Sequence, residues 1–392
     1  MAARAVKITS LPSGAEQMLV AMDDARRDTL ALVAPIGEED LKGVHSPIMS
    51  PLAWDLGHIA AYEDLWLGHR YGGLELLRPD LANLYDAFET PRKIRGEIDA
   101  LAPEDAKAYM TEVSARVAEL ICERGIDDGV LCEMVLRHEL QHCETMRQTL
   151  AIAGLLAEDE RAQIAAPLSD EEPQGWLTVH AGPFEMGASD ERFAYDNERP
   201  RHVARVEEFA IARRPVSNAS WLHFSEGGGY ERREWWSREG WAWKEEHDIT
   251  HHPGVASGHP DAPACHVSWF EADAFARAHD ARLPTEQEWE KAATWTQGTS
   301  QRDGTTSAIG GAPAIGGVGR VWEWTASRFD GYPGFTAYPY REYSEVFFGG
   351  RYRVLRGSSW ATHPRVASAR FRNWDLPLRR QIFAGVRLAR SA

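Results

Sequence analysis

The feature that most constrains this chain is a HExxH sequence, residues 138–142, which lies inside a helical pattern of apolar residues. Because four residues make about one turn of an α-helix, His138 and His142 project from the same face and can reach one metal ion. The same pattern occurs in zinc proteases, where Glu139 would act as general base. The HExxH sequence is also consistent with two ordinary histidines that have hydrogen-bond partners and bind no metal. The sequence therefore predicts a helix that carries a candidate metal clamp.

The length of the chain predicts two domains. At 392 residues it exceeds what one ordinary hydrophobic core supports. Residues 157–175 are acidic, contain prolines and lack a long apolar period, which is typical of a linker. We therefore expect a helical bundle over residues 1–160, a linker over residues 161–175 and a second domain over residues 176–392.

Composition and charge exclude several classes of partner. A formal net charge of -16 disfavours nucleic-acid binding, which needs clustered Lys and Arg to neutralise phosphates. No apolar run is long enough for a membrane span, and residues 1–16 lack the apolar segment of a signal peptide. The four cysteines show no CxxC pair, as expected of free thiols in a reducing compartment. We expect a cytoplasmic protein with a small-molecule or protein partner, and its oligomeric state stays open.

The N-terminal half contains four helical patterns. Apolar residues recur at helical spacing over residues 15–33, 52–67, 103–126 and 128–155. The second pattern starts after Pro51 and carries His58 among apolar neighbours, so we expect His58 to face the interior of a bundle. Helical bundles build metal sites from inward-facing side chains. His58 could therefore join His138 and His142, although a lone interior His is usually a hydrogen-bonded core residue.

A longer loop between the second and third helical patterns carries two arginines. Arg92 and Arg95 lie three residues apart after Pro91 and could form a fork for a carboxylate. From composition alone, a solvated basic turn in an acidic protein explains them more simply.

The C-terminal half is built differently. Most of the 15 tryptophans lie beyond residue 170, and short alternating apolar runs at residues 177–179, 203–206 and 209–211 are separated by Gly, Pro and Asn turns. Only two clear helices are predicted, over residues 217–224 and 269–280. The pattern indicates an irregular α+β domain with long loops, which so many tryptophans would keep ordered.

Seven motifs of the C-terminal half occur in the order that they have in one known family. They are Gly182–Gly187, Asp196–Pro200, Pro215–Asn218, His266–Trp269, Arg282–Glu290, Val321–Thr325 and Leu355–Trp360. Together they resemble the formylglycine-generating-enzyme type of domain, a variant of the C-type lectin fold. As physical features they are turns, helix caps and buried aromatic pairs, and none of them specifies a reaction.

The chain as a whole resembles a known family from about residue 20 to residue 390. A DinB-like four-helix bundle with a His and an HxxxH, followed by a C-type-lectin-like α+β domain with little regular secondary structure, is similar to the hercynine oxygenases. These are the sulfoxide synthases of ergothioneine biosynthesis. Beyond the HExxH helix, the most telling segments are Ser50–His58, Tyr332–Phe335, Tyr340–Ser344, Phe371–Asp375 and Arg379–Gly385. Ordered agreement of this length is far rarer by chance than HExxH alone.

The resemblance implies a set of site residues and substrates. The positions of the non-haem Fe(II) ligands match His58, His138 and His142. The positions that hold hercynine match Gln141, Tyr343, Asn373 and Trp374, and those that hold γ-glutamylcysteine match Arg92, Arg95 and Asp375. Tyr340 matches the tyrosine that delivers a proton to oxygen during the reaction. The implied substrates are hercynine, O2 and a thiol, either γ-glutamylcysteine or cysteine.

These residue types suit the implied chemistry. Three neutral imidazoles leave the full charge of Fe(II) and about three open positions, which favours an anionic thiolate. Substrates gathered at one metal react in an intramolecular step. With an ordinary pKa of about 10, a tyrosine stays protonated until a strong base forms. Trp374 suits a trimethylammonium group by cation–π attraction.

Three alternatives stay open. Residues 294–319 are shorter than is usual in the family, and residues 247–263 are also abbreviated, which is similar to the selenoneine synthases and their selenosugar donor. The Arg92/Arg95 loop and Asn373-Trp374-Asp375 favour the sulfur reaction instead. A zinc metalloprotease would explain HExxH but nothing downstream, and its third ligand normally follows the helix. The non-enzyme alternative is a ligand-binding domain beside a structural metal site.

Overall fold

The computed structural model describes residues 13–189, 193–256, 258–294 and 315–392. The chain divides into two compact units, unit 1 over Met1–Leu156 and unit 2 over Ala157–Ala392. Within the described ranges, no helix is both long and apolar enough to cross a membrane. Most of the shortened stretch at residues 294–319 lies outside the described residues.

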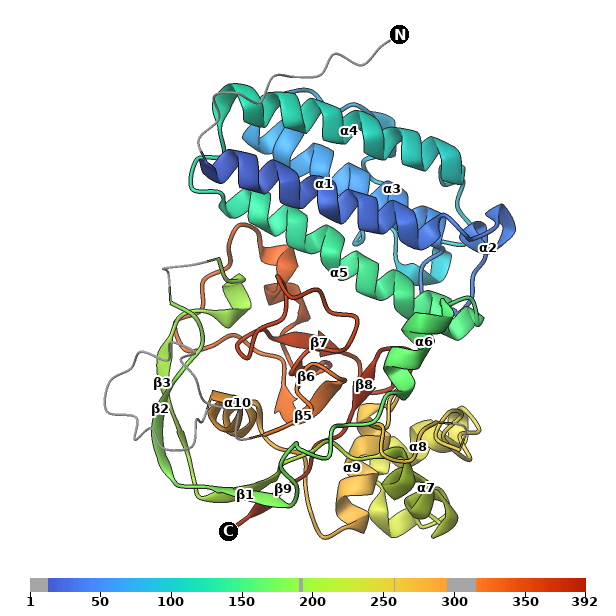
Figure 1. The fold of residues 1–392 in the computed structure, drawn as a ribbon, viewed down its shortest axis with the longest axis vertical. Helices are drawn as coiled ribbons and strands as arrows, with labels where there is room; N and C mark the ends of the chain where they lie inside the picture. The colour runs from blue at the N-terminus through green and yellow to red at the C-terminus, as the bar shows by residue number, and fades with distance from the viewer. Residues whose placement is uncertain (1–12, 190–192, 257, 295–314) are drawn as a thin grey trace. The chain divides into compact units, whose positions relative to one another are not determined.

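Unit 1 is a bundle of long helices that lie side by side (Figure 1). Its α-helices are α1 Ser13–Val33, α2 Glu38–Lys42, α3 Leu52–Glu63, α4 Pro103–Arg124 and α5 Val130–Ala153. α3 packs against both α4 and α5, and α1 packs against α5. The four predicted helices are α1, α3, α4 and α5, so the predicted helical bundle is confirmed.

The ends of these helices follow from local sequence. Pro103 occupies the first turn of α4, where its missing N–H has no intrahelical partner to lose, and Glu104 and Asp105 complement the helix dipole. Gly154 ends α5 in the left-handed conformation, with a φ of 72°. α3 does not end in a cap but continues as a π-helix over Asp64–Tyr71.

The interior of unit 1 is filled by apolar side chains from α3, α4 and α5. Its fully buried members include Leu52, Trp54, Leu56, Met110, Val113, Ile121 and Met146. Burial of one such aliphatic side chain contributes about 1.5–3 kcal/mol to stability. The packed core therefore fixes α3, which carries His58, and α5, which carries His138 and His142.

Within its described residues, unit 2 forms three small sheets. One has the strand order β1 (Trp176–Val179), β4 (Phe209–Ala212) and β9 (Ala389–Ser391), and a second pairs β2 (Gly182–Met186) with β3 (His202–Val206). The third has the order β7 (Asn373–Asp375), β6 (Arg353–Arg356), β5 (Trp322–Arg328) and β8 (Ala384–Gly385). β5 and β8 are parallel, whereas the other neighbouring strands run antiparallel. The three predicted strand segments lie in β1, β3 and β4, as expected for an α+β domain.

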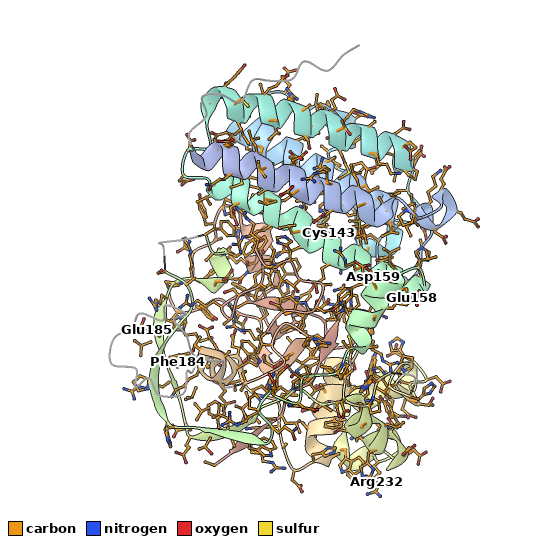
Figure 2. All side chains as sticks on the ribbon, in the orientation of Figure 1. Cys143, Glu158, Asp159, Phe184, Glu185 and Arg232 are labelled. Atoms are coloured by element: carbon orange, nitrogen blue, oxygen red, sulfur yellow. The ribbon has the colours of Figure 1, made fainter. Side chains whose placement is uncertain are left out.

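Unit 2 contains more helix than the sequence predicted. The two predicted helices are α7 (Asn218–Glu226) and α9 (Trp269–Ala278). The described part of the unit also holds α6 (Glu158–Ala165), α8 (Arg238–Glu246) and α10 (Glu286–Thr294). α6 lies in the stretch interpreted as a linker, and Figure 2 labels Glu158 and Asp159 at its start, where acidic side chains complement the helix dipole.

The apolar pattern indicated only two clear helices and did not reveal α10 (Glu286–Thr294), because the glutamates of α10 find partners far away in sequence. A charged run of this kind usually marks a solvated face. Here Glu286 and Glu288 are buried. Glu286 accepts two hydrogen bonds from Arg372 at 2.9 Å, and Glu288 accepts two from Arg282 at 2.7 Å. Ion pairs that hold these two buried carboxylates, which periodicity does not reveal, allow α10 to lie in the core.

Candidate metal centre

His58 is held in a fixed orientation on α3. Its Nδ1–H donates to the backbone carbonyl of Tyr85 at 2.7 Å, which leaves a lone pair on Nε2. Tyr85 can lie this close because residue 57 is Gly: a Cβ at that position would lie 2.1 Å from the Tyr85 ring. Trp54 stacks on the imidazole with the ring centroids 4.8 Å apart. The side chain is buried, at 7% exposure.

The structure brings His58 together with the two histidines of the HExxH helix. His138 and His142 lie one turn apart on α5. One ring nitrogen from each of the three residues lies within 4.8 Å of the others. The Nε2 atoms of His58 and His138 are 3.1 Å apart. The three imidazoles therefore converge on one point in unit 1.

Two of these imidazoles are kept neutral by their surroundings. Burial, together with the charge of His142, lowers the pKa of His58 well below its usual value. Burial and the charges of His142 and His58 lower the pKa of His138 in the same way. A neutral imidazole carries a lone pair, so both rings can act as metal ligands at neutral pH.

The donor set fits a divalent transition-metal ion. Three imidazole nitrogens are a common donor set for zinc, copper and iron and leave coordination positions open. A cation between the two facing Nε2 atoms would satisfy both lone pairs. Nδ1 of His142 is buried and has no hydrogen-bond partner among the described residues.

Two further residues of unit 1 complete the surroundings of the three histidines. The ring of Tyr62 stacks on His138 with the centroids 3.7 Å apart and the planes at 12°. Asp55 Oδ1 lies 3.4 Å from Nδ1 of His142. Neither residue is among those predicted from the sequence. Both lie on α3 within about one turn of His58, so counting helical positions from His58 would have found them.

Glu139 belongs to a buried ion cluster. Arg26 of α1 donates to both oxygens of its carboxylate, at 2.8 and 3.0 Å. Thr29 donates to Oε1 of Glu139 at 2.7 Å, and Arg26 also donates to Glu63 at 2.7 Å. Cys143, one turn further along α5 and labelled in Figure 2, lies 3.2 Å from the Thr29 hydroxyl. Glu139 therefore fastens α5 to α1, which is not the position of a protease general base.

The two arginines of the predicted fork have different surroundings. Arg92 is exposed. Arg95 is buried and donates to Ser50 Oγ at 2.7 Å and to the carbonyl of Thr90 at 2.8 Å. Its guanidinium lies 3.6 Å over the ring of Trp54. Burial lowers the pKa of Arg95 to about 10. Arg95 thus braces its loop against α3, whereas Arg92 is available to a ligand.

A second group of predicted site residues gathers in unit 2. The rings of Tyr340 and Tyr343 meet edge-on at 6.1 Å, and those of Tyr343 and Trp374 at 6.0 Å. All three residues are partly exposed. Tyr195, which is not among the residues predicted from the sequence, stacks on Tyr343 at 4.6 Å with the planes at 9°. Phe329 stacks on Trp374 at 4.2 Å. We call this cluster of five packed rings the aromatic corner: Tyr195, Phe329, Tyr340, Tyr343 and Trp374.

The polar residues of β7 flank this aromatic corner. Asn373 Oδ1 accepts a hydrogen bond from the backbone N–H of Trp374 at 2.8 Å. Asp375 lies 3.5 Å from the guanidinium of Arg379. Because side chains alternate along a strand, Asn373 and Asp375 share one face of β7 and Trp374 lies on the other. Gln141, the remaining predicted residue, is partly exposed on α5 of unit 1.

Known proteins match nearly the whole chain. Residues 21–146 match the DinB superfamily, and residues 162–311 and 314–392 match the sulfatase-modifying factor enzyme 1-like domain. The hercynine oxygenase of Mycobacterium tuberculosis is 40% identical, over 95% of this chain and 98% of the relative. That of Mycolicibacterium smegmatis is 40% identical, over 93% and 96%. A formylglycine-generating enzyme of Thermomonospora curvata is 32% identical, over 31% of this chain and 48% of the relative.

Proposed function

The chain belongs to the hercynine oxygenase family, and we propose that it uses non-haem Fe(II) and O2 to join a thiol sulfur to the imidazole carbon of hercynine. The observation that carries the proposal is the convergence of His58, His138 and His142, whose ring nitrogens lie within 4.8 Å of one another. These positions match the metal ligands of the family. The proposed product is the sulfoxide that leads to ergothioneine.

The proposed reaction balances without a further co-reactant. The thiol S–H and the imidazole C–H bonds break, and a C–S bond forms between the two substrates. One oxygen atom of O2 enters the sulfoxide, and the other leaves as water with the two released protons. The four electrons that reduce O2 come from the two substrates, and bound Fe(II) would pass them to O2 and offer a positive centre for the thiolate. The residues of the chain must then hold both substrates and place one proton.

Hercynine carries a trimethylammonium group, and the aromatic corner of unit 2 suits such a cation. The partly exposed faces of Tyr343 and Trp374 offer cation–π attraction of about 0.5–2 kcal/mol. Because Tyr195 and Phe329 stack behind these two rings, little side-chain freedom is lost on binding. We assign Asn373 and Gln141 to polar contacts with the same substrate, because both positions match the family pattern.

The thiol donor is assigned to the arginine loop and Asp375. Arg92, which is exposed, would pair with a carboxylate, and Asp375 would receive the ammonium group. Arg95 is already committed to Ser50 and Thr90, so it would act mainly by holding Arg92 and its loop in place. γ-Glutamylcysteine offers both a carboxylate and an ammonium group at a distance from its thiol, which favours it over cysteine.

Tyr340 is the proposed proton donor. Its ring packs edge-on against Tyr343, a residue assigned to hercynine, so its hydroxyl belongs to the same corner of unit 2. A phenol holds its proton at neutral pH and releases it only to a strong base, such as reduced oxygen.

The alternatives explain fewer observations. A zinc protease needs Glu139 as a base, but this carboxylate is taken up by Arg26 and Thr29, and the third imidazole is His58, upstream of the HExxH helix. A selenosugar would give Arg92 and Asp375 no carboxylate or ammonium group to bind. A ligand-binding protein with a structural metal would not need the open coordination positions of a three-histidine site.

The proposal is tested by loading the protein with Fe(II) without oxygen and then adding hercynine with one donor at a time. The donors are γ-glutamylcysteine, cysteine and a selenosugar, and the readouts are O2 uptake and product mass. We expect the fastest uptake with γ-glutamylcysteine. Loss of O2 uptake with every donor would contradict the proposed reaction, whereas faster uptake with the selenosugar would contradict only the choice of donor.

A pair of variants tests the donor assignment separately. Arg92→Ala removes an exposed charge, so it should raise the KM for γ-glutamylcysteine while the melting temperature stays unchanged. Arg95→Ala removes a buried brace and should lower the melting temperature as well. An Arg92→Ala enzyme with an unchanged KM for γ-glutamylcysteine would refute the assignment of this loop.

A further inference from the structure

Asp55 is a buried carboxylate to which the proposed reaction gives no task. It lies in the first turn of α3 and is 1% exposed. Neither of its carboxylate oxygens has a hydrogen-bond partner among the residues that the structure describes. A favourable helix dipole alone does not offset the cost of burying a carboxylate charge without hydrogen bonds. Such an orphaned group in a packed bundle points to a partner that completes it.

The imidazole of His142 faces this carboxylate. Nδ1 of His142 lies 3.4 Å from Oδ1 of Asp55 and is itself buried without a hydrogen-bond partner in the described ranges. The distance slightly exceeds an ordinary N–H···O bond, so a small rotation of the imidazole would close it. Arg95 also attracts the Asp55 charge, but its own donors are engaged with Ser50 and Thr90.

The other ring nitrogen of His142 is the one that a metal would use. If Nδ1 carries the proton that Asp55 accepts, Nε2 is left with a lone pair. His58 is arranged on the same plan, with its Nδ1–H given to the Tyr85 carbonyl and its Nε2 left unprotonated. In both residues a group outside the donor set thus selects the tautomer.

We propose that Asp55 is the positioning residue of the metal centre, which orients His142, fixes its tautomer and offsets part of the charge of the bound ion. This inference rests on the proposed metal site. Carboxylates that accept a hydrogen bond from a metal-binding imidazole typically change metal affinity by about 10- to 100-fold. Asp55 is buried beside His142, so its effect passes through His142.

The test measures Co2+ binding to the metal-free full-length protein by the visible absorption of the bound ion. Asp55→Ala should bind Co2+ about 10- to 100-fold more weakly than the wild type. Asp55→Asn keeps an oxygen that can accept the Nδ1–H but loses the charge. Its Co2+ affinity should therefore lie between that of the wild type and that of Asp55→Ala. The melting temperature of metal-free Asp55→Asn should be unchanged or higher, because the variant removes an unpaired buried charge.

Asp64→Asn is the matched control. Asp64 is also 1% exposed and directly follows α3, but its carboxylate accepts hydrogen bonds from the backbone N–H of Leu77 and from Tyr109. The control should melt at a lower temperature and bind Co2+ normally. If Asp55 had only a structural role, Asp55→Asn would lower the melting temperature and the Co2+ affinity together. An equal loss of Co2+ affinity in Asp64→Asn would also contradict a specific role for Asp55.

The outcomes separate this inference from the function on which it rests. Normal Co2+ affinity in both Asp55 variants overturns the role of Asp55 and leaves the metal site intact. A wild type that binds no Co2+ overturns the metal site, and the inference falls with it. If Asp55→Ala does not fold, the affinity and the absorption spectrum of Asp55→Asn decide the question.

Discussion

At the scale of single residues, the three histidines of unit 1 are held by neighbours that are not themselves donors. The Tyr85 carbonyl fixes one ring nitrogen of His58, and the ring of Tyr62 covers one face of His138. Glu139 lies between two of the histidines in sequence but is bonded to Arg26 instead. Its role in the molecule is to hold α5 against α1, so that the two histidines of α5 keep their place.

The variant Glu139→Gln separates a structural role of Glu139 from a role as catalytic base. It weakens the charge-assisted hydrogen bonds to Arg26, so we expect the free energy of unfolding to fall by about 1.5–3 kcal/mol in chemical denaturation. The O2 uptake with hercynine and thiol should stay within a few-fold of the wild type. A drop of several orders of magnitude in turnover with unchanged stability would mean that Glu139 acts as a base after all.

Tyr340→Phe tests the proposed proton donor. The variant keeps the ring that packs against Tyr343 and loses only the hydroxyl, so hercynine affinity should be unchanged. Because a positioned general acid contributes about 10²- to 10⁴-fold, turnover to the sulfoxide should fall within that range. Tyr338→Phe is the matched control, since this tyrosine is two residues away and 53% exposed, and its turnover should be normal. Equal turnover in the two variants would remove Tyr340 from the reaction.

At the scale of secondary structure elements, α3 and the loop that follows it form one support for the metal centre. Tyr85 packs directly on Gly57, and Arg95 stacks on Trp54 from the same loop. Trp54 in turn stacks on His58. The loop therefore reaches the histidine through both a hydrogen bond and a stack of rings.

Gly57→Ala should disturb this support. The added Cβ would lie 2.1 Å from the Tyr85 ring, so the loop must move away and take the Tyr85 carbonyl from His58. We expect a loss of about 1–3 kcal/mol in stability, as for other overpacked sites, together with weaker metal binding in a titration. Gly37→Ala, which meets nothing within 4 Å, is the control and should behave like the wild type. Unchanged metal affinity in Gly57→Ala would argue against the support.

The helices of unit 1 could be predicted from sequence because their apolar residues repeat with the period of an α-helix. The same period is broken in unit 2, where Glu286 and Glu288 point inward to Arg372 and Arg282. A buried ion pair resembles a solvated face until its partner is known. This is the physical reason why the apolar pattern did not reveal α10 but did reveal α9, which also has a capping box at Ser268.

Part of the candidate site could be predicted as well. Spacing on one helix predicted His138 and His142 as a pair, and the expected interior position of His58 in a bundle made it a candidate third ligand, to which the resemblance gave a role. Tyr195 could not be found in this way, because its stacking on Tyr343 joins segments far apart in sequence. The different surroundings of Arg92 and Arg95 also depend on tertiary contacts that their spacing does not reveal.

At the scale of the whole molecule, part of the proposed substrate-binding set, including Tyr343 and Trp374, belongs to unit 2, so the stability of unit 2 limits the proposed function. His266 of unit 2 has a pKa lowered to about 4, chiefly by burial and then by the charge of His252. An unfolded histidine has a pKa of about 6.5. The unfolded chain therefore binds a proton at this position at a higher pH than the folded chain does.

This difference predicts an acid-sensitive unit 2. The contribution of His266 to the free energy of unfolding is fully present above about pH 6.5. It falls as the pH decreases toward 4, because protonation favours the unfolded state in this window. Urea unfolding followed by tryptophan fluorescence, at several pH values in that range, measures the effect. His266→Asn should flatten the pH dependence, and Asn tolerates the positive φ of 64° at this position. The same slope in wild type and variant would assign the acid sensitivity to other groups.

The most direct test of the central claim is the mass of the product formed from hercynine and γ-glutamylcysteine under isotopically heavy O2. The Fe(II)-loaded protein should form a C–S-linked sulfoxide that carries one heavy oxygen atom, and His58→Ala and His138→Ala should form none. Recovery of unchanged hercynine from the wild type, or equal product from the histidine variants, would contradict a three-histidine iron oxygenase.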